Sequence, residues 1–445
     1  MSGLEILGLL MMLAMISIIF VGFPIAFTLL FIALLFGSIG LGTNQTFGLA
    51  YLQIWGTMKD DILPAVPLFV FMGYMSEQAG LMERLFLALR NLLAPLRGSL
   101  YLAVLLTATI FAMATGIVGA AVTVLGIMAG PVMVRTGYDA KLSAGAIAAG
   151  GTLGILVPPS VMLVVMGPTI GVPVNILYSS AFGPGLLLAG MYIVYCLARS
   201  AWNPSLGPPV PKAERVTDPV ELAKEFFVGI LPLAALIGFT LGTILTGLAT
   251  PTEAASCGAF GATLLALLYR RLTFKALKTA AISTMITSSM VLLLVVASNI
   301  FGAVFTKLGA TELIANALLQ LPLPDSGKLL LVMVLIFVLG WPFEWPAIIL
   351  VFLPIFLPVI EKLDFGLTKL EMLTWFGTLV AVNLQTAFLS PPVAMSAYYL
   401  KNVMPQWGLA TIYRGMGQFM VIQIICLALI ILWPELVLWL PRALK

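Results

Sequence analysis

The chain contains no histidine and only three cysteines among its 445 residues. Cys196, Cys257 and Cys426 lie far apart in the sequence, each within an apolar segment. These absences argue against a zinc or haem centre, a cysteine–histidine nucleophile and a disulfide framework. We therefore expect no transition-metal site, no cofactor and no enzymatic activity.

Charge is scarce as well: 9% of the residues are charged, whereas 61% are hydrophobic. This balance excludes an ordinary soluble domain. The net charge of +4 is spread over loops, so nothing indicates a nucleic-acid partner. A spanning helix needs about 20 apolar residues, and roughly ten to thirteen membrane elements fit into this length. The sequence predicts an all-α polytopic protein embedded in a lipid bilayer.

The most informative feature present is a Pro-Pro step that interrupts an apolar stretch twice, at Pro158-Pro159 and at Pro391-Pro392. Proline removes an amide donor and disfavours the helical conformation of the residue before it. At membrane depth such breaks persist only where protein or a water-filled cavity covers the freed backbone groups. Two breaks at corresponding points of two halves indicate a transport site near the bilayer midplane.

The repeat extends beyond the prolines. Gly80 and Glu83 have counterparts at Gly309 and Glu312. A long span interrupted by small or kinking residues follows in each half, and then the Pro-Pro helix. An odd number of crossings separates the two predicted hairpins, which indicates an inverted-topology repeat. The positive-inside rule favours a cytoplasmic 199–226 linker, and Arg84–Leu96 has the apolar-basic pattern of an interfacial helix.

The expected boundaries follow from this order. The first half, 1–199, contains scaffold spans, a re-entrant hairpin at about 62–82, a broken helix at 100–134 and a Pro-Pro helix at 143–170. A polar linker occupies 200–226. The second half, 227–445, contains a hairpin at about 280–310, a broken helix at 329–360, a Pro-Pro helix at 372–400 and a final span at 415–440. We interpret the first segment, Leu4–Phe20, as a retained span rather than a cleaved signal peptide, because it lacks a basic leader.

Few ionisable residues fall inside the predicted spans, and Glu344 is the strongest candidate among them. Burying a carboxylate there requires a functional reason, such as holding a cation. The alternative is a loop-end glutamate bonded to the kinked backbone. Glu253, Glu83 and Glu312 instead fit the first turns of helices, where an acid caps the N-terminus.

The other polar groups near the breaks are neutral. Hydroxyls, amides and freed carbonyls suit a monovalent cation such as sodium, whereas half-helix N-termini suit a carboxylate. Single hydroxyls in membrane helices often bond only the preceding turn, and that alternative stays open for each of them. The cation candidates are Pro64, Thr115, Gly116, Gly119, Ser298, Asn299, Gly340 and Glu344. The substrate candidates are Thr152, Gly154, Ser160, Gln385, Thr386 and Ser390.

Six segments spread nearly end to end carry a family resemblance: Gly22–Phe27, Val66–Gly73, Thr115–Ala121, Gly151–Ser160, Gly247–Ala255 and Asn383–Pro392. With them the chain resembles the large membrane subunit, or permease, of tripartite ATP-independent periplasmic (TRAP) transporters, within the ion-transporter superfamily. The resemblance implies an elevator-type, sodium-coupled importer of organic acids in the bacterial inner membrane. It also implies two partners, a small four-span membrane subunit and a periplasmic substrate-binding protein. The family often has aspartate where this chain has Glu344.

Two other interpretations remain open. One is a stand-alone ion-coupled carrier of organic anions from the same superfamily. The other is a polytopic membrane transferase, which the absence of histidine and the few buried acids disfavour. A channel is a further possibility, but channels do not need broken hairpins in inverted repeats.

Overall fold

The computed structural model describes residues 2–115, 118–211, 215–216, 218–391 and 394–444. Every regular element in these ranges is a helix, which confirms the predicted all-α class. Seven of the helices described are long and apolar enough to cross a membrane. They are α1 (Gly3–Val21), α7 (Val118–Arg135), α10 (Val174–Trp202), the α11–α12 segment (Pro219–Leu245), α14 (Phe274–Lys307), α19 (Lys369–Leu389) and α21 (Leu409–Leu432).

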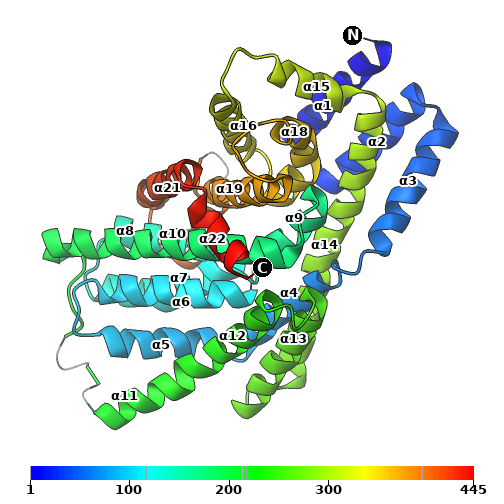
Figure 1. Ribbon diagram of the computed structural model, residues 1–445. Helices are drawn as coiled ribbons and strands as arrows, with labels where there is room; N and C mark the ends of the chain where they lie inside the picture. Colours follow the sequence, from blue (N-terminus) through cyan, green and yellow to red (C-terminus); the bar gives the residue numbers. More distant parts are fainter. Residues whose placement is uncertain (1, 116–117, 212–214, 217, 392–393, 445) are drawn as a thin grey trace.

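A group of steep helices forms one side of the molecule (Figure 1). α1, α2 (Ile25–Gly40) and α3 (Thr43–Met58) follow one another, and α14 packs against α2 and α3. Small residues allow this close approach, as expected for helix packing in lipid. A Cβ atom on Gly37 would lie 2.7 Å from Thr46 Cγ2 and 3.2 Å from Val304 Cγ1.

Two matching turns lead into shorter helices. α4 (Ala65–Gln78) leads through Gly80 into α5 (Leu81–Leu93), and α14 leads through Gly309 into α15 (Ala310–Leu319). Both glycines are left-handed, with φ of 68° and 81°. Glu83 and Glu312 lie in the first turns that follow, where the helix dipole favours an acid. Glu253 likewise forms a capping box with Thr250 at the start of α13 (Pro251–Leu268).

The segment 280–310 differs from its sequence-based prediction. We expected a re-entrant hairpin broken near its middle, but α14 runs unbroken from Phe274 to Lys307. It contains no proline, and its lone Gly302 weakens a helix by only about 1 kcal/mol. The segment 62–82 is likewise not broken near its middle, because α4 continues to Gln78. Pro67 falls in the first turn of α4, where no intrahelical amide donor is needed.

The segment 100–134 also differs, because its two parts fold back on each other. α6 (Ser99–Thr115) and α7 pack side by side and both pack on α8 (Ala140–Thr152) (Figure 1). A kinked single span would keep its parts end to end. The hairpin of the first half is therefore formed by α6 and α7, and residues 116–117 lie outside the described ranges.

Three further interruptions complete the pattern. In the first half α8 continues as a short 3-10 turn, η1 (Leu153–Ile155), and the chain resumes as α9 (Val161–Ile170). In the second half α16 (Asp325–Leu339) and α17 (Trp345–Ala347) are separated, and α17 continues through η5 (Ile348–Phe352) into α18 (Leu353–Ile360). α19 ends at Leu389, and α20 (Met395–Val403) follows. Proline accompanies each of these breaks, at Pro158, Pro342 and Pro391.

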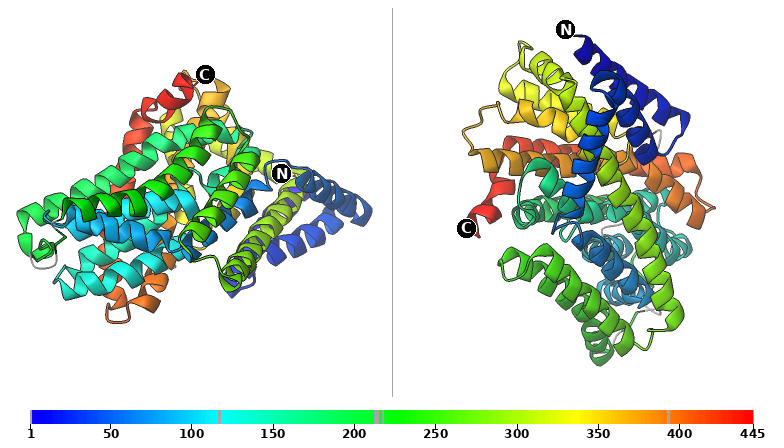
Figure 2. Two further views of the ribbon diagram at one scale, coloured as in Figure 1. Left: turned by 90° about the horizontal axis from the view of Figure 1, so that it is seen from below. Right: turned by 90° about the vertical axis from the view of Figure 1, so that its right-hand side faces the viewer.

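The two halves interlock rather than stand apart. α8 of the first half packs on α21 of the second, and α10 of the first half packs on α19 of the second (Figure 2). The helix α22 (Glu435–Ala443) packs over both α10 and α19. Its Val437 and Leu438 are buried, and Arg442 Nε lies 2.8 Å from Glu371 Oε1 at the start of α19. Arg442 also pairs with Glu435 on α22 itself.

Candidate functional site

A cavity of about 180 Å³ lies where the interrupted elements of both halves meet, and we name it the central cavity. Its wall includes Glu344, Tyr399 and Gly119, together with Thr287 on the continuous helix α14. The remaining lining residues are Val70, Val118, Ile155, Val161, Met290, Val291, Trp345, Pro346, Phe388 and Met395.

Four helices begin at the central cavity. Their first residues all line it: Val118 of α7, Val161 of α9, Trp345 of α17 and Met395 of α20. Helix N-termini carry unpaired amide hydrogens and a partial positive charge. Because the first residue of each of the four helices lines the central cavity, these helix N-termini lie at its wall. The arrangement makes an otherwise apolar cavity attractive to an anion.

Glu344 lies between the central cavity and a neighbouring cavity of about 120 Å³ that contains Gly340, Pro342 and Ala387. Its backbone caps α17, but its side chain makes no capping hydrogen bond. Within the described part of the chain the Glu344 carboxylate has no hydrogen bond or ion pair. The alternative of a glutamate bonded to the kinked backbone therefore has no contact to support it. A half-buried, unpartnered carboxylate is costly in an apolar site unless it serves a ligand.

Gly119 and Tyr399 bring the two halves into contact at the cavity. A Cβ atom on Gly119 would lie 2.9 Å from Cζ of Tyr399, so only glycine leaves room for the ring. The Tyr399 hydroxyl lies 4.0 Å from the Met395 sulfur, its one hydrogen-bonding neighbour in the described part of the chain. At another side of the cavity, Thr287 and Tyr74 join α14 to α4 through hydroxyls 3.0 Å apart.

A second group of polar side chains is fully buried between α8, α10, α19 and α21, and we name it the polar cluster. It consists of Thr152, Gln385, Gln423 and Tyr192, all 0% exposed. Thr152 Oγ1 lies 3.2 Å from Gln385 Oε1 and 3.5 Å from Gln423 Nε2, and Tyr192 lies beside them. Gln385 Nε2, Gln423 Oε1 and the Tyr192 hydroxyl have no hydrogen-bond partner in the described part of the chain. Buried polar atoms without partners call for an explanation.

The substrate candidates divide into three kinds. Thr152 and Gln385 belong to the polar cluster, as just described. Ser160 and Thr386 donate to the backbone carbonyls of Ile155 and Asn383, each at 2.6 Å, so both hydroxyls bond to the backbone a few residues before them. Ser390 Oγ is buried at the end of α19 and has no partner among the residues that the structure describes, and Gly154 is buried in η1 beside the cavity residue Ile155.

The cation candidates do not form one group. Gly119 borders the central cavity, Gly340 borders the neighbouring cavity, and Glu344 borders both. Asn299 lines a separate cavity of about 180 Å³ between α3, α9 and α14, where its Nδ2 donates to Thr57 Oγ1 at 3.0 Å. Ser298 Oγ is buried nearby without a partner in the described chain, and Pro64 is exposed at the start of α4. The continuity of α14 places Ser298 and Asn299 against α3 rather than at a hairpin tip. Gly116 and the Thr115 side chain lie outside the described residues.

Sequence reasoning missed Tyr399, Thr287, Tyr192 and Gln423. Tyr399 carries a weak signal, since it belongs to a tyrosine pair shortly after the second Pro-Pro step. Thr287 was hidden because its helix was expected to fold back. Gln423 is an isolated amide within the apolar α21, and only the packing of α21 on α8 gives it a polar neighbour.

Comparison with known proteins gives a consistent picture. The family model described as "Tripartite ATP-independent periplasmic transporter, DctM component" matches residues 10–436. The sialic acid TRAP transporter large permease protein of Vibrio cholerae is 30% identical over 433 residues, 96% of each chain. The C4-dicarboxylate TRAP transporter large permease protein of Pseudomonas aeruginosa is 28% identical and covers 88% of both chains. The 2,3-diketo-L-gulonate TRAP transporter large permease protein of Escherichia coli is 25% identical, over 92% of this chain and 98% of its own.

Two solved structures share the fold. The YdaH transporter of Alcanivorax borkumensis superimposes with a TM-score of 0.62 at 17% identity, covering 88% of this chain and 89% of its own. MtrF of Neisseria gonorrhoeae, described as illuminating a class of antimetabolite efflux pumps, gives a TM-score of 0.59 at 14% identity over 88% and 84% of the two chains. At such identities the likeness concerns the fold alone.

Proposed function

Because this chain belongs to the DctM component family of tripartite ATP-independent periplasmic transporters, multi-pass permeases of the bacterial inner membrane, we propose that it carries an organic acid anion across that membrane as the large permease subunit. The observation that carries the proposal is the convergence of four helix N-termini on the central cavity. The relatives named above handle sialic acid, C4-dicarboxylates and 2,3-diketo-L-gulonate. All three are carboxylates, so a carboxylate is the substrate class that fits this cavity.

In our proposal the substrate carboxylate accepts hydrogen bonds from the freed amides at the starts of α9 and α20. The four N-termini offset part of the anion's desolvation, which makes an apolar cavity usable for a charged substrate. Tyr399 on α20 and Thr287 on α14 both line the central cavity and offer hydroxyls to the rest of the substrate. In this proposal the polar cluster lies between the two halves and does not contact the substrate directly, because none of its residues lines the central cavity.

Sodium is the coupling ion in this scheme. The Glu344 carboxylate supplies hard oxygen atoms beside the substrate cavity. A sodium ion bound there neutralises Glu344 and permits an anion to enter next to it. In the first half the start of α7 at Gly119 also lines the central cavity and offers a second position, so the repeated architecture favours two ions.

We infer further that the two halves are related by inversion and move as an elevator. Between α5 and α15 the chain crosses the membrane as the α8–α9 pair, α10, α12, α13 and α14, an odd number of crossings. The turns at Gly80 and Gly309 therefore fall on opposite sides. The hairpins and interrupted helices would move together against α4 and α14, which line the central cavity from the scaffold side.

A periplasmic substrate-binding protein and a small four-span membrane subunit complete the system that we propose, since the matching family is tripartite. The test is uptake into proteoliposomes containing the purified chain with both partners supplied. We expect accumulation of a carboxylate that the binding protein delivers, and accumulation only along a sodium gradient. Accumulation indifferent to sodium would reject the coupling, and the absence of any uptake with both partners present would reject the transport role.

A further inference from the structure

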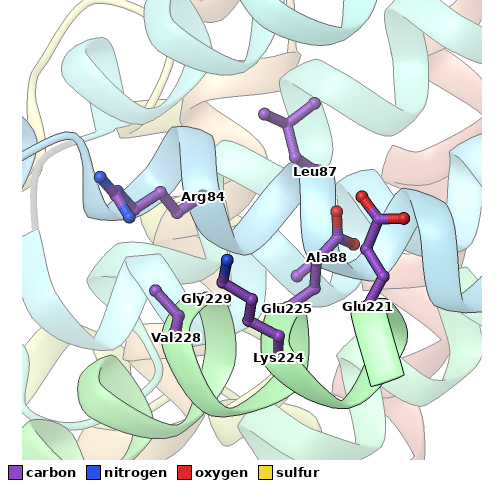
Figure 3. Close-up of a pocket in the computed structure, with 8 residues that line it drawn as sticks. All are labelled: Arg84, Leu87, Ala88, Glu221, Lys224, Glu225, Val228 and Gly229. Atoms are coloured by element: carbon purple, nitrogen blue, oxygen red, sulfur yellow. The ribbon is translucent and has the colours of Figure 1, made fainter. Parts of the chain in front are cut away.

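A pocket lies outside the transport machinery, between α5 and the segment that runs from α11 (Pro219–Glu225) into the π-helix η4 (Phe226–Ile230) (Figure 3). Its volume is about 270 Å³, and we name it the α5–α11 pocket. Four of its residues are uncharged, namely Leu87, Ala88, Val228 and Gly229, and four are charged, namely Arg84, Lys224, Glu221 and Glu225.

Local packing fixes the shape of the α5–α11 pocket. A Cβ atom on Gly229 would lie 2.8 Å from Ala88 Cβ and 3.0 Å from the Arg84 carbonyl, so glycine lets the two helices touch. At one end Asn91 Nδ2 donates to both oxygens of Glu225, at 2.7 and 2.8 Å. The pocket is therefore held open between a glycine contact and an amide–carboxylate contact.

The charged side chains are arranged by sign. Figure 3 shows the carboxylates of Glu221 and Glu225 on one side of the pocket, with the Lys224 amine and the Arg84 guanidinium toward the other. The Arg84 guanidinium stacks 4.3 Å from the ring centroid of Tyr269, which holds it in place. Among the described residues no salt bridge joins these four groups to one another. Charges of both signs are thus available to one ligand within a small space.

The surroundings are apolar and exposed. Leu87 is 47% exposed, Phe227 60% and Val228 37%. On a membrane protein such side chains contact lipid chains, and basic side chains beside them, such as Arg84 and Lys224, can reach lipid headgroups. A ligand that fits must therefore carry three parts: an apolar part, an anionic group that binds Arg84 and Lys224, and a cationic group that binds the Glu221 carboxylate.

We propose that the α5–α11 pocket binds a phospholipid with a phosphoethanolamine headgroup. The phosphate accepts hydrogen bonds from Arg84 and Lys224, and the primary ammonium donates to Glu221. The acyl chains run along Leu87 and Phe227. A choline headgroup offers no N–H donor to Glu221, and a glycerol headgroup offers no positive charge, so the pocket distinguishes among these three lipids.

The experiment is native mass spectrometry of the purified full-length chain, with phosphatidylethanolamine, phosphatidylglycerol and phosphatidylcholine of identical acyl chains supplied at equal concentration. The unaltered chain should retain phosphatidylethanolamine in preference to the other two. The double variant Arg84→Gln/Lys224→Gln should retain it about tenfold less well, because two charge-assisted hydrogen bonds to phosphate are lost. The single variant Glu221→Gln should bind phosphatidylglycerol as before but lose its preference for phosphatidylethanolamine.

The matched control is Lys275→Gln/Lys278→Gln, which removes two exposed lysines of α14 that do not line the pocket. Its lipid retention should equal that of the unaltered chain. Equal retention of the three lipids by the unaltered chain overturns the proposal, and so does retention that survives the Arg84/Lys224 double variant. A pocket reserved for a protein partner would show the first of these results. Because the substituted side chains are at the surface, a thermal melt confirms that each variant is folded.

Discussion

At the scale of single residues, Glu344 combines exposure to two cavities with the lack of any partner in the described chain. We predict that Glu344→Gln reduces sodium-driven uptake by about tenfold or more, because a neutral amide offers a cation weaker electrostatic attraction than a carboxylate. Glu344→Asp should keep part of the activity. Uptake into proteoliposomes across a range of sodium gradients measures the effect.

Glu361→Gln is the matched control for Glu344, since Glu361 is an exposed carboxylate paired with Lys369 at 3.0 Å. It should leave uptake unchanged. Normal sodium dependence in Glu344→Gln would remove Glu344 from the cation site.

Gly119 is a second residue whose role follows from a distance. The Cβ of Gly119→Ala would lie 2.9 Å from Tyr399 Cζ and push the ring off its rotamer, at a cost of about 1 kcal/mol. We expect uptake to fall about tenfold. Gly242→Ala on α12 is the control, because nothing lies within 4 Å of its Cβ position. If both variants transport equally, the contact between Gly119 and Tyr399 has no role in transport.

Substitution of Gln423 tests whether the polar cluster takes part in transport or only stabilises the fold. Gln423→Leu removes a buried oxygen without a partner, and such an oxygen destabilises a protein by about 1–3 kcal/mol, so the melting temperature should not fall. Uptake should fall nevertheless, because Thr152 loses a polar neighbour. Gln418→Leu on the same helix should lower the melting temperature and leave uptake unchanged, since Gln418 accepts a 2.6 Å hydrogen bond from Tyr195. Unimpaired uptake in Gln423→Leu would make the cluster a structural feature only.

At the scale of elements, the interrupted helices were more predictable than their spatial arrangement. Proline and glycine at Pro158, Gly340 and Pro391 coincide with real ends of helices, because a missing amide donor acts locally. Whether two segments fold back or continue straight depends on their neighbours. α6 and α7 fold back because both pack on α8, and α14 stays straight between α2, α3 and α4. Hydropathy along the sequence contains none of those contacts.

The two left-handed turns give a prediction about stability. Gly80 has a φ of 68°, a conformation that costs a residue with a Cβ about 1 kcal/mol. Gly80→Ala should therefore lower the melting temperature measured in detergent. Gly190→Ala, in the middle of α10 with nothing within 4 Å of its Cβ position, should instead leave the melting temperature unchanged or raise it. Equal melting temperatures for the two variants would show that a side chain at position 80 does not strain the turn.

At the scale of the whole molecule, the interlocking of α8 with α21 and of α10 with α19 means that neither half buries its core alone. The candidate site follows the same logic. Thr152 and Gln385 could be predicted from the repeated motif, and they meet across the two halves at 3.2 Å. Tyr192 and Gln423 complete that cluster through long-range packing, which a motif does not encode.

The inverted arrangement of the halves can be tested by labelling. Glu83 and Glu312 are exposed and occupy matching places after the left-handed turns. In a background with exposed Cys257 replaced by serine, we expect Glu83→Cys and Glu312→Cys to react with a membrane-impermeant thiol reagent from opposite sides of sealed vesicles. Reaction of both from the same side would contradict the inversion.

The packing of α22 has a consequence for biosynthesis. A ribosome makes α22 after α10 and α19. The pairing of Arg442 with Glu371 and the burial of Val437 and Leu438 can therefore form only once α22 has been synthesised. A polypeptide that stops before Glu435 lacks these contacts and leaves apolar surface of α10 and α19 uncovered. Synthesis of α22 thus removes a surface that would otherwise favour aggregation.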